Sequence, residues 1–272
     1  MGLLYWQIII FSQNGDRKMS QKRIDKILNI IKEQGYVTVK YLCEELHYST
    51  ATINRDLNDL QKQRLIVRHY GGAELAAKKG IPLVFRYHKM RPVKRLIAKK
   101  AAEFIRDGMT VFIDGSTTAQ YVGEYIKNVK DLTVITNNLN LASHLSERDV
   151  SCICLGGRIV EIPYMIGGVE ASNQAGLYKT DMAFFSTSGI TSNGKITERG
   201  DLYLYLHKTM IENSEKSVFL VDHEKVDVPG KRILCDLSGV GAIITDWKFS
   251  SEIKEKFPST EFIEVETPKT QK

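Results

Sequence analysis

The stretch from residue 49 to residue 72, STATINRDLNDLQKQRLIVRHYGG, constrains the fold of this chain more than any other segment. Ser49 can cap a helix, and Ile53, Leu57 and Leu60 recur behind it at the spacing of one helical face. A short apolar run, a basic tip and two glycines follow, which is typical of a strand and a turn. The stretch therefore predicts a helix followed by a two-stranded ribbon.

Two more helices are predicted upstream of this one. Apolar residues repeat at helical spacing in both, at Ile24, Ile27, Leu28 and Ile31 and again at Val39, Leu42, Cys43 and Leu46. Gly35 is expected to end the first of them. The short turn between the second and third helices has the spacing of a helix-turn-helix. With the ribbon as a wing, this part is predicted to be a winged helix-turn-helix.

The outer face of the third predicted helix carries side chains that suit base edges in the major groove of DNA. They are Thr50, Asn54, Arg55 and Asn58. Arginine pairs with guanine there, and asparagine pairs with adenine. In the ribbon, Arg68 and His69 are placed to contact phosphates or to enter the minor groove. The alternative is a three-helix bundle with a solvated polar face.

The distribution of charge favours nucleic-acid binding. Residues 16–100 carry 20 basic and 8 acidic side chains, whereas residues 101–272 carry 18 basic and 24 acidic ones. A basic segment on an acidic remainder is the electrostatic signature of a DNA-binding unit joined to a different domain. Residues 76–93, which are basic and contain Pro82 and Pro92, are the predicted linker.

Arg23, TINRDL at 52–57 and RHYGGA at 68–73 resemble the signature of the DeoR family of winged helix-turn-helix regulators. The resemblance implies DNA contacts by Arg23 and Thr52 as well. The usual core motif of the family is TIRRDL, so Asn54 replaces an arginine and alters the DNA sequence expected, not the mode of binding. Because the resemblance begins near Met19, we expect Met19 to be the natural start, with a DNA-binding domain over 19–75 and a non-native upstream extension over 1–18.

From Val93 onward the pattern changes to short apolar strands that alternate with helices. Strands are predicted at 109–114, 133–136, 151–155, 182–186, 217–222 and 242–246, and helices at 94–105, 118–127, 138–147 and 200–213. This alternation predicts an α/β domain over residues 94–267, with a mainly parallel sheet and helices on both faces. Ligands of such a sheet bind at the carboxyl ends of its strands.

Polar loops follow several of these predicted strands. They are DGSTT at 114–118, TNN at 136–138, GGR at 156–158, TSG at 187–189 and DHEK at 222–225. Each loop alone could be an ordinary helix cap. Together they favour a pocket for a sugar phosphate, because hydroxyl, amide and backbone N–H groups bind phosphate oxygens.

The same loops resemble the sensor domain of DeoR-type regulators, which is similar in fold to ribose-5-phosphate isomerase and CoA transferases. The resemblance implies that a phosphorylated sugar is the effector. It implies a phosphate cradle at Ser116, Thr117 and Thr118, sugar contacts by Asp114 and Asn137, and further effector-binding roles for Gly157, Lys208 and Lys225. Lys94 also falls where the family pattern has a lysine.

An isomerase-like or deaminase-like enzyme with a DNA-binding head is the alternative. Asp114, Asp181, Glu198 and Asp222 could each act as an acid or base at a strand end. Their spacing identifies no matched pair, so no catalytic residue is assigned. The four cysteines are scattered and predict reduced thiols rather than a zinc site, and no cofactor or metal is expected.

The sequence as a whole predicts a regulator of transcription rather than an enzyme. No apolar run reaches the roughly 20 residues that a membrane-spanning helix needs. We therefore expect a cytoplasmic repressor of a carbohydrate-utilisation operon. It is expected to bind double-stranded operator DNA as a homodimer or homotetramer and to respond to a phosphorylated sugar.

Overall fold

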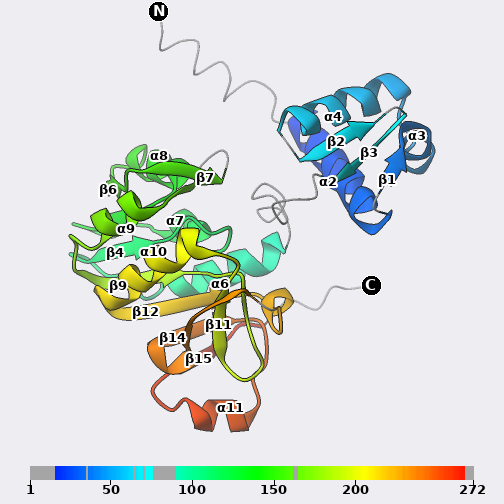
Figure 1. The fold of residues 1–272 in the computed structure, drawn as a ribbon. Coiled ribbons are helices and arrows are strands. Elements are labelled where there is room, and N and C mark those ends of the chain that lie inside the picture. Colours follow the sequence, from blue (N-terminus) through cyan, green and yellow to red (C-terminus); the bar gives the residue numbers. More distant parts are fainter. Residues whose placement is uncertain are drawn as a thin grey trace, which may run out of the picture. The chain divides into compact units, whose positions relative to one another are not determined.

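The computed structural model describes residues 16–34, 36–63, 65–69, 71–75, 90–161, 165–228 and 230–266. The chain forms two compact units, residues 1–88 and residues 89–272, and each is described by itself (Figure 1). Most of the predicted extension and linker, together with Gly35, lie outside the described residues. The predicted domain limits at residues 18, 75 and 93 stay predictions. No described helix is long and apolar enough to cross a membrane.

The described part of the N-terminal unit consists of three helices and three short strands. Its elements are α2 (Asp16–Gln34), β1 (Tyr36–Thr38), α3 (Val39–Leu46), α4 (Thr50–Lys62), β2 (Ile66–His69) and β3 (Gly72–Leu75). The strands pair antiparallel in the order β1-β3-β2. Ser49 caps α4 by accepting the backbone N–H of Thr52 at 3.3 Å. The predicted winged helix-turn-helix is confirmed.

The apolar sides of these elements meet in one core. Its fully buried members include Ile27, Ile31, Leu42, Ile53, Leu57 and Leu60. Burying each of these side chains stabilises the fold by roughly 1.5–3 kcal/mol. Because the core packs against the inner side of α4, the opposite side of this helix is left to carry polar residues.

The C-terminal unit is centred on a seven-stranded sheet whose neighbouring strands all pair parallel (Figure 1). Its strands are β4 (Thr110–Ile113), β5 (Thr133–Thr136), β6 (Ser151–Cys154), β9 (Thr180–Phe185), β12 (Ser214–Val221), β14 (Ala242–Thr245) and β15 (Glu261–Glu264). Their order across the sheet is β15-β14-β12-β9-β4-β5-β6. The chain thus builds outward from β4 in one direction and from β9 in the other.

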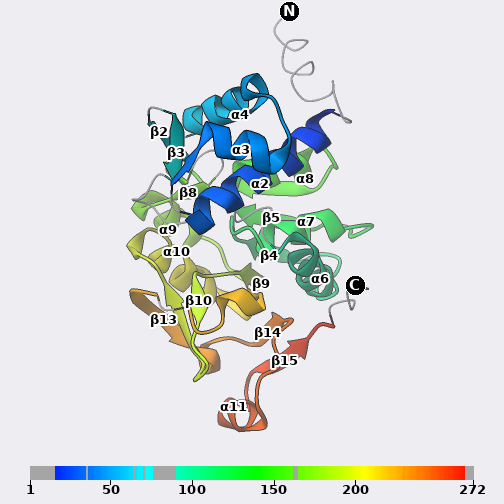
Figure 2. The same cartoon turned by 90° about the vertical axis from the view of Figure 1, so that its right-hand side faces the viewer.

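Helices cover both faces of this sheet (Figure 2). One face carries α6 (Arg91–Ala102), α7 (Val122–Tyr125) and α8 (Leu139–Ser146), and the other carries α9 (Val169–Ala175) and α10 (Asp201–Glu212). Alternate side chains of each strand serve the two faces. Phe112 and Ala183, for example, pack with Leu206 and Met210 of α10. The predicted α/β architecture with a mainly parallel sheet is confirmed.

Smaller elements complete the unit. They are the hairpin of β7 (Arg158–Glu161) and β8 (Met165–Gly167), the antiparallel sheet of β10 (Gly189–Ile190), β11 (Lys195–Glu198) and β13 (Arg232–Asp236), the helix α11 (Ser251–Lys256), and the short turns η1 (Ala119–Tyr121), η2 (His223–Lys225) and η3 (Leu237–Gly239). The helix predicted over 118–127 is wrong in extent. It consists of η1 and the single turn α7, because Ile126 already has extended backbone angles (φ −69°, ψ 111°).

Candidate functional site

The outer side of α4 gathers most of the residues that the sequence predicts at the DNA. Thr50, Arg55 and Asn58 are exposed, and Thr52 and Asn54 are partly exposed. The hydroxyls of Thr52 and Ser49 lie 3.0 Å apart, so the start of the helix is ordered by its own cap. This side of α4 presents hydroxyl, amide and guanidinium groups, which are the groups that pair with base edges.

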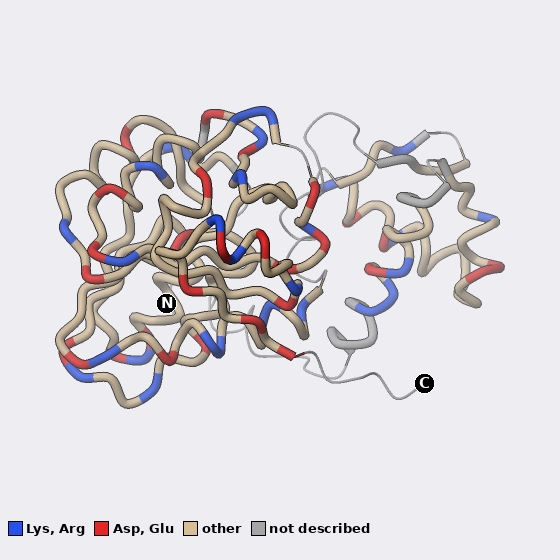
Figure 3. Tube along the Cα trace, turned by 90° about the horizontal axis from the view of Figure 1, so that it is seen from below, with Lys and Arg blue, Asp and Glu red and all other residues tan. Residues whose placement is uncertain are grey.

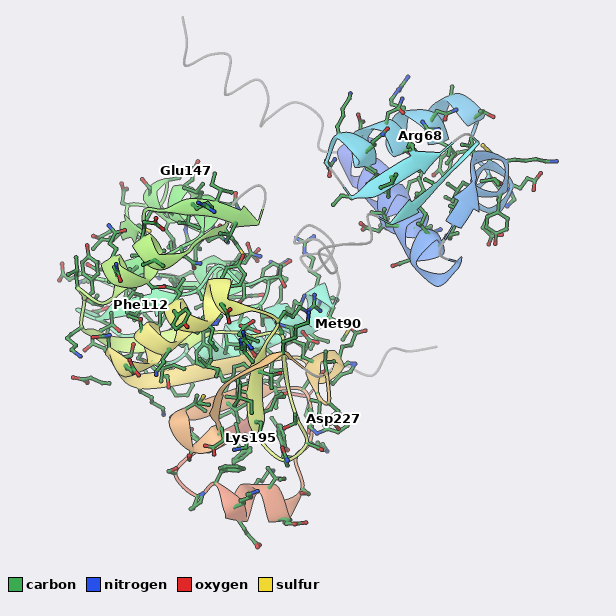
Figure 4. All side chains as sticks on the ribbon, in the orientation of Figure 1. Arg68, Met90, Phe112, Glu147, Lys195 and Asp227 are labelled. Atoms are coloured by element: carbon green, nitrogen blue, oxygen red, sulfur yellow. The ribbon has the colours of Figure 1, made fainter. Side chains whose placement is uncertain are left out.

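Arg68 of β2 joins this surface from the wing. Its Nη1 donates to Asn58 Oδ1 at 2.6 Å, and its Nη2 donates to Asn54 Oδ1 at 2.7 Å (Figure 4). The strand and the helix are therefore linked on their polar side as well as through the core. The prediction for His69 concerns a side chain outside those that the structure describes.

Arg23 occupies a different place from the other predicted DNA contacts. Its Nε and Nη2 donate to the two carboxylate oxygens of Asp56, at 2.5 and 3.0 Å. Its guanidinium also lies over the Tyr48 ring, 4.7 Å from the ring centroid. The hydrogen bond to Asp56 raises the pKa of Arg23 despite partial burial. Since only 15% of the Arg23 side chain is exposed, the residue mainly ties α2 to α4.

In the C-terminal unit, a polar cluster lies where the strand order reverses. Strands β4 and β9 are neighbours, and the chain proceeds outward from each on opposite sides. Their carboxyl ends therefore lie at the position where α/β sheets generally bind ligands, and this position is called the crevice below. Polar side chains in the loops around this point, and in the helices and the strand beside them, are almost fully enclosed. They are Lys94, Asp114, Ser116, Thr117, Thr118, Asn137, Asn138, Ser186, Thr187, Glu198, His207 and Asp222.

The loop after β4 holds its own residues in a network. Ser116 donates its backbone N–H and its hydroxyl to Asp114 Oδ1, at 3.1 and 2.6 Å, and the Ser116 hydroxyl accepts the N–H of Ala119 at 3.1 Å. The hydroxyl of Thr117 accepts from Lys94 Nζ at 3.1 Å. Thr118 Oγ1 is enclosed and has no hydrogen-bond partner among the described residues.

The loop after β5 connects that network to the β7–β8 hairpin. Asn137 accepts the N–H of Gly115 at 2.7 Å and donates to the carbonyl of Ile166 at 2.7 Å. Gly157 precedes the hairpin with φ +139°, and a Cβ there would lie 3.2 Å from Ile166. Asn137 and Gly157, both predicted to bind the effector, therefore help to position the backbone around the crevice.

A buried histidine joins the two sides of the crevice. His207 of α10 places Nε2 at 2.8 Å from Asp114 Oδ2 and Nδ1 at 3.0 Å from Glu198 Oε1, and only 3% of the residue is exposed. Burial lowers the pKa of His207, but hydrogen bonds and charge from Asp114 and Glu198 outweigh this and raise it to about 9. His207 is therefore a cation at neutral pH, held between two carboxylates.

The remaining predicted lysines divide between the crevice and the outer surface. Lys225 follows β12 and donates to Ser186 Oγ at 2.8 Å and to the carbonyl of Thr187 at 2.9 Å, which places it at the carboxyl end of β9. Lys208 lies on the solvent side of α10, where 63% of its side chain is exposed and Nζ is 3.8 Å from Glu212. The structure thus brings Lys225 to the crevice and leaves Lys208 at the surface.

The comparison with protein families decides the identity of both units. A model of the DeoR C-terminal sensor domain matches residues 90–247, and a model of the DeoR-like helix-turn-helix domain matches residues 23–79. The chain belongs to the DeoR family. It is a DNA-binding transcriptional regulator, as the sequence predicted.

Relatives within the DeoR family align along most of the chain. The glycerol-3-phosphate regulon repressor of Escherichia coli (strain K12) is 34% identical over 227 residues, which are 83% of this chain and 90% of that protein. The lactose phosphotransferase system repressor of Staphylococcus aureus (strain NCTC 8325 / PS 47) is 27% identical over 239 residues, which are 86% of this chain and 94% of that protein.

A solved structure also matches part of the chain. Ribose 5 phosphate isomerase A from Neisseria gonorrhoeae matches 49% of this chain and 52% of that chain, with 18% identity and a TM-score of 0.36.

Two parts of the DeoR-type sensor crevice were missed by sequence reasoning. His207 gives no signal in the sequence, because a single histidine in a helix is indistinguishable from a surface residue. Asn138 looks like a helix cap, and it does cap α8, but its Nδ2 also lies 3.4 Å from the carbonyl of Gly115. Glu198 was considered as an acid or base, and instead it accepts from Ser188 Oγ at 2.9 Å and from the N–H of Arg199 at 3.2 Å.

Among the described residues, no group of three or more His, Cys, Asp or Glu side chains is arranged to hold a metal ion. Burial raises the pKa of the Cys152 and Cys235 thiols to about 11. These two thiols are therefore protonated at neutral pH, and a protonated thiol is a poor nucleophile.

Proposed function

We propose that this DeoR-family regulator represses a carbohydrate-utilisation operon and is released from its operator by a phosphorylated sugar. The α4 surface would contact the operator, and the crevice at the carboxyl ends of β4, β5, β9 and β12 would hold the effector. Relatives named as repressors of glycerol-3-phosphate and lactose systems support both halves of this proposal.

The observation that carries the proposal is the Thr118 hydroxyl. Enclosing a hydroxyl without a hydrogen-bond partner costs about 1–3 kcal/mol, and Thr118 Oγ1 has no partner among the described residues. A phosphate oxygen would satisfy it. The neighbouring Lys94 would supply the positive charge, since its Nζ already contacts Thr117 of the same loop.

The enclosure of Thr118 also supplies a reason for coupling. Because the Oγ1 atom is covered in this state, a ligand that reaches it must displace part of its cover. Binding then favours a second conformation to the extent that the ligand's affinity differs between the two states. We propose that this second conformation disfavours operator binding.

The hydrogen bonding of the carboxylates favours sensing over catalysis. An acid or base must exchange a proton with the substrate. Both oxygens of Asp114 and both oxygens of Glu198 already lie against protein groups. Asp181 accepts the N–H of Thr110 at the amino end of β4, away from the carboxyl ends of the strands. The pattern supports a binding site that is rigid until a ligand enters.

We further propose that the protein acts as a homodimer or homotetramer in the cytoplasm. Each chain supplies one recognition helix, whereas helix-turn-helix regulators commonly bind two half-sites about one helical turn of DNA apart. A regulator of transcription works where the operator DNA is. Mass photometry with and without operator DNA tests the assembly, and a monomer bound to a single half-site would refute it.

The deciding experiment is a fluorescence anisotropy titration at fixed salt. The DNA is the region upstream of the gene cluster that encodes the protein, and the additions are sugar phosphates, glycerol 3-phosphate and their unphosphorylated parents. We expect release by a phosphorylated compound and no release by its parent. Specific binding that no phosphorylated compound changes would refute the effector assignment.

Two lysine variants sharpen this titration. Lys94→Met should abolish the response to the phosphorylated compound while retaining operator binding, since methionine has a similar volume without the charge. Lys99→Met, an exposed position on the same helix, is the matched control and should respond as the wild type does. Equal responses from both variants would remove Lys94 from the phosphate site.

A further inference from the structure

The wing arginine and the recognition helix share a hydrogen-bonded cluster. Arg68 donates from Nη1 to Asn58 and from Nη2 to Asn54, at 2.6 and 2.7 Å (Figure 4). The two asparagines are four residues apart on α4, so they lie one above the other on the same side of the helix. One guanidinium thus spans one turn of the recognition helix.

The chemistry of the groups fixes how this cluster is oriented. Arginine has only N–H donors, so each asparagine must turn its oxygen toward Arg68 and its NH₂ group elsewhere. The guanidinium has five donors, of which the cluster uses two. Three remain, and a bidentate contact to the O6 and N7 atoms of guanine needs two. This cluster of Arg68, Asn54 and Asn58, called the clamp below, therefore orients the guanidinium and leaves enough N–H donors to bind a base.

The position of the clamp decides which groove Arg68 can enter. Asn58 is exposed and lies on the side of α4 that carries Arg55, away from the buried Ile53 and Leu57. Asn54 is partly exposed and lies at the flank of that side. An arginine held against that side accompanies α4 into the groove that α4 occupies. The major groove, about 12 Å wide, admits a helix or a two-stranded ribbon.

We infer that Arg68 is a specificity-determining residue that reads a guanine in the major groove, and that Asn54 and Asn58 hold it in place. This inference rests on the proposed operator-binding role of α4. It differs from the sequence-based expectation in two respects: Arg68 leaves the phosphates and the minor groove, and the two asparagines act on Arg68 instead of pairing with adenine through both amide atoms. The usual family motif has an arginine at position 54. That arginine would remove the amide oxygen that accepts from Arg68 and would place a second positive charge beside it.

The test uses operator DNA with single modified guanines. Replacing a guanine by 7-deazaguanine removes the N7 acceptor from the major groove, whereas replacing it by inosine removes the amino group from the minor groove. At one operator position we expect 7-deazaguanine to weaken wild-type binding about 5- to 150-fold and to leave Arg68→Ala unchanged. Inosine at that position should affect wild type and variant alike.

Two further variants separate base reading from charge. Lys62→Ala removes an exposed positive charge from the end of the same helix and should weaken binding to all sequences equally. Asn54→Ala should lower selectivity at the guanine that Arg68 reads, and should add nothing in the Arg68→Ala background. If the effects of Asn54→Ala and Arg68→Ala on selectivity are additive, Asn54 does not act through Arg68 and the inference is overturned.

The outcomes also separate this inference from the operator-binding proposal. If the wild type selects no operator sequence, the proposed role of α4 fails. If the wild type is selective but Arg68→Ala weakens binding equally on every modified duplex, only the inference about Arg68 is overturned. The same holds if its effect follows the inosine substitutions.

Discussion

The two recognition regions of this protein use polar side chains in opposite ways. On the outer side of α4 the polar groups are exposed or partly exposed, and the apolar groups beneath them hold the helix. At the crevice, the polar groups are enclosed and hold one another, as in the contacts among Asp114, His207 and Glu198. An exposed group can be changed without disturbing the fold, whereas an enclosed one supports the fold and the ligand together.

The charge distribution follows the same division. The acidic excess of residues 101–272 is spread along the chain among basic residues (Figure 3). At the crevice, by contrast, the buried His207 lies between the carboxylates of Asp114 and Glu198. Substitutions at α4 should therefore change binding alone, and substitutions at the crevice should change stability as well. Four experiments test this contrast.

The largest effect is expected from His207→Gln. Removing the cation leaves two buried carboxylates without a matching charge, which costs about 3–5 kcal/mol. Hydrogen exchange measured by mass spectrometry reports each unit separately, and we expect lost protection across β4, β11 and α10 but not across α4. Tyr205→Gln, at an exposed position of the same helix, is the control. Equal protection in both variants would contradict the role of His207.

Alkaline pH should weaken the same unit by a slightly smaller amount. His207 has a pKa near 9 in the folded chain, above its ordinary value of 6.5, so its contribution is complete below pH 6.5 and is lost as the pH rises through 9. The loss between pH 6 and pH 10 is on the order of 3 kcal/mol. Urea unfolding of the sensor unit across this range measures it. A wild-type profile that matches His207→Gln would disprove this assignment.

Arg55→Ala tests the other side of the contrast. Arg55 is exposed, so its loss should leave both units folded while operator affinity falls by about 1–3 kcal/mol and base selectivity relaxes. Anisotropy on single-base operator variants measures both effects. The factor by which the effector lowers operator affinity should be the same as in the wild type. Unchanged selectivity would exclude Arg55 from base reading.

Thr118→Val should have the smallest effect on stability. Replacing an enclosed hydroxyl that lacks a partner by a methyl group relieves its desolvation, so the sensor unit without effector should gain up to about 1 kcal/mol. Release from the operator by the effector should be lost. A stabilised variant that still responds fully would show that Thr118 does not contact the phosphate.

The fold was predictable where apolar residues repeat at a regular spacing or form a continuous run. Ile53, Leu57 and Leu60 mark the buried side of α4. Six of the seven strands of the central sheet were predicted from their apolar runs, and the edge strand β15 was not. The β7–β8 hairpin and the β10–β11–β13 sheet were not found, because strands of two to five residues with mixed polarity carry no clear period.

The candidate sites were predictable to the level of loops but not of partners. The 114–118 loop was recognised by its composition, yet its link to His207 joins residues 93 positions apart. Arg23 was predicted at the DNA, and only the structure shows its paired contact with Asp56. Local patterns do not encode which distant side chain completes a buried network.

The sequence separation between Asp114 and His207 has a consequence for folding during synthesis. All described elements of the N-terminal unit lie between residues 16 and 75, whereas the crevice needs β4, β9 and α10 to meet. Chains fold domain by domain from the N-terminal end during synthesis, and distant contacts form late. A nascent chain on the ribosome therefore completes its DNA-binding unit well before the histidine that contacts the 114–118 loop has been translated.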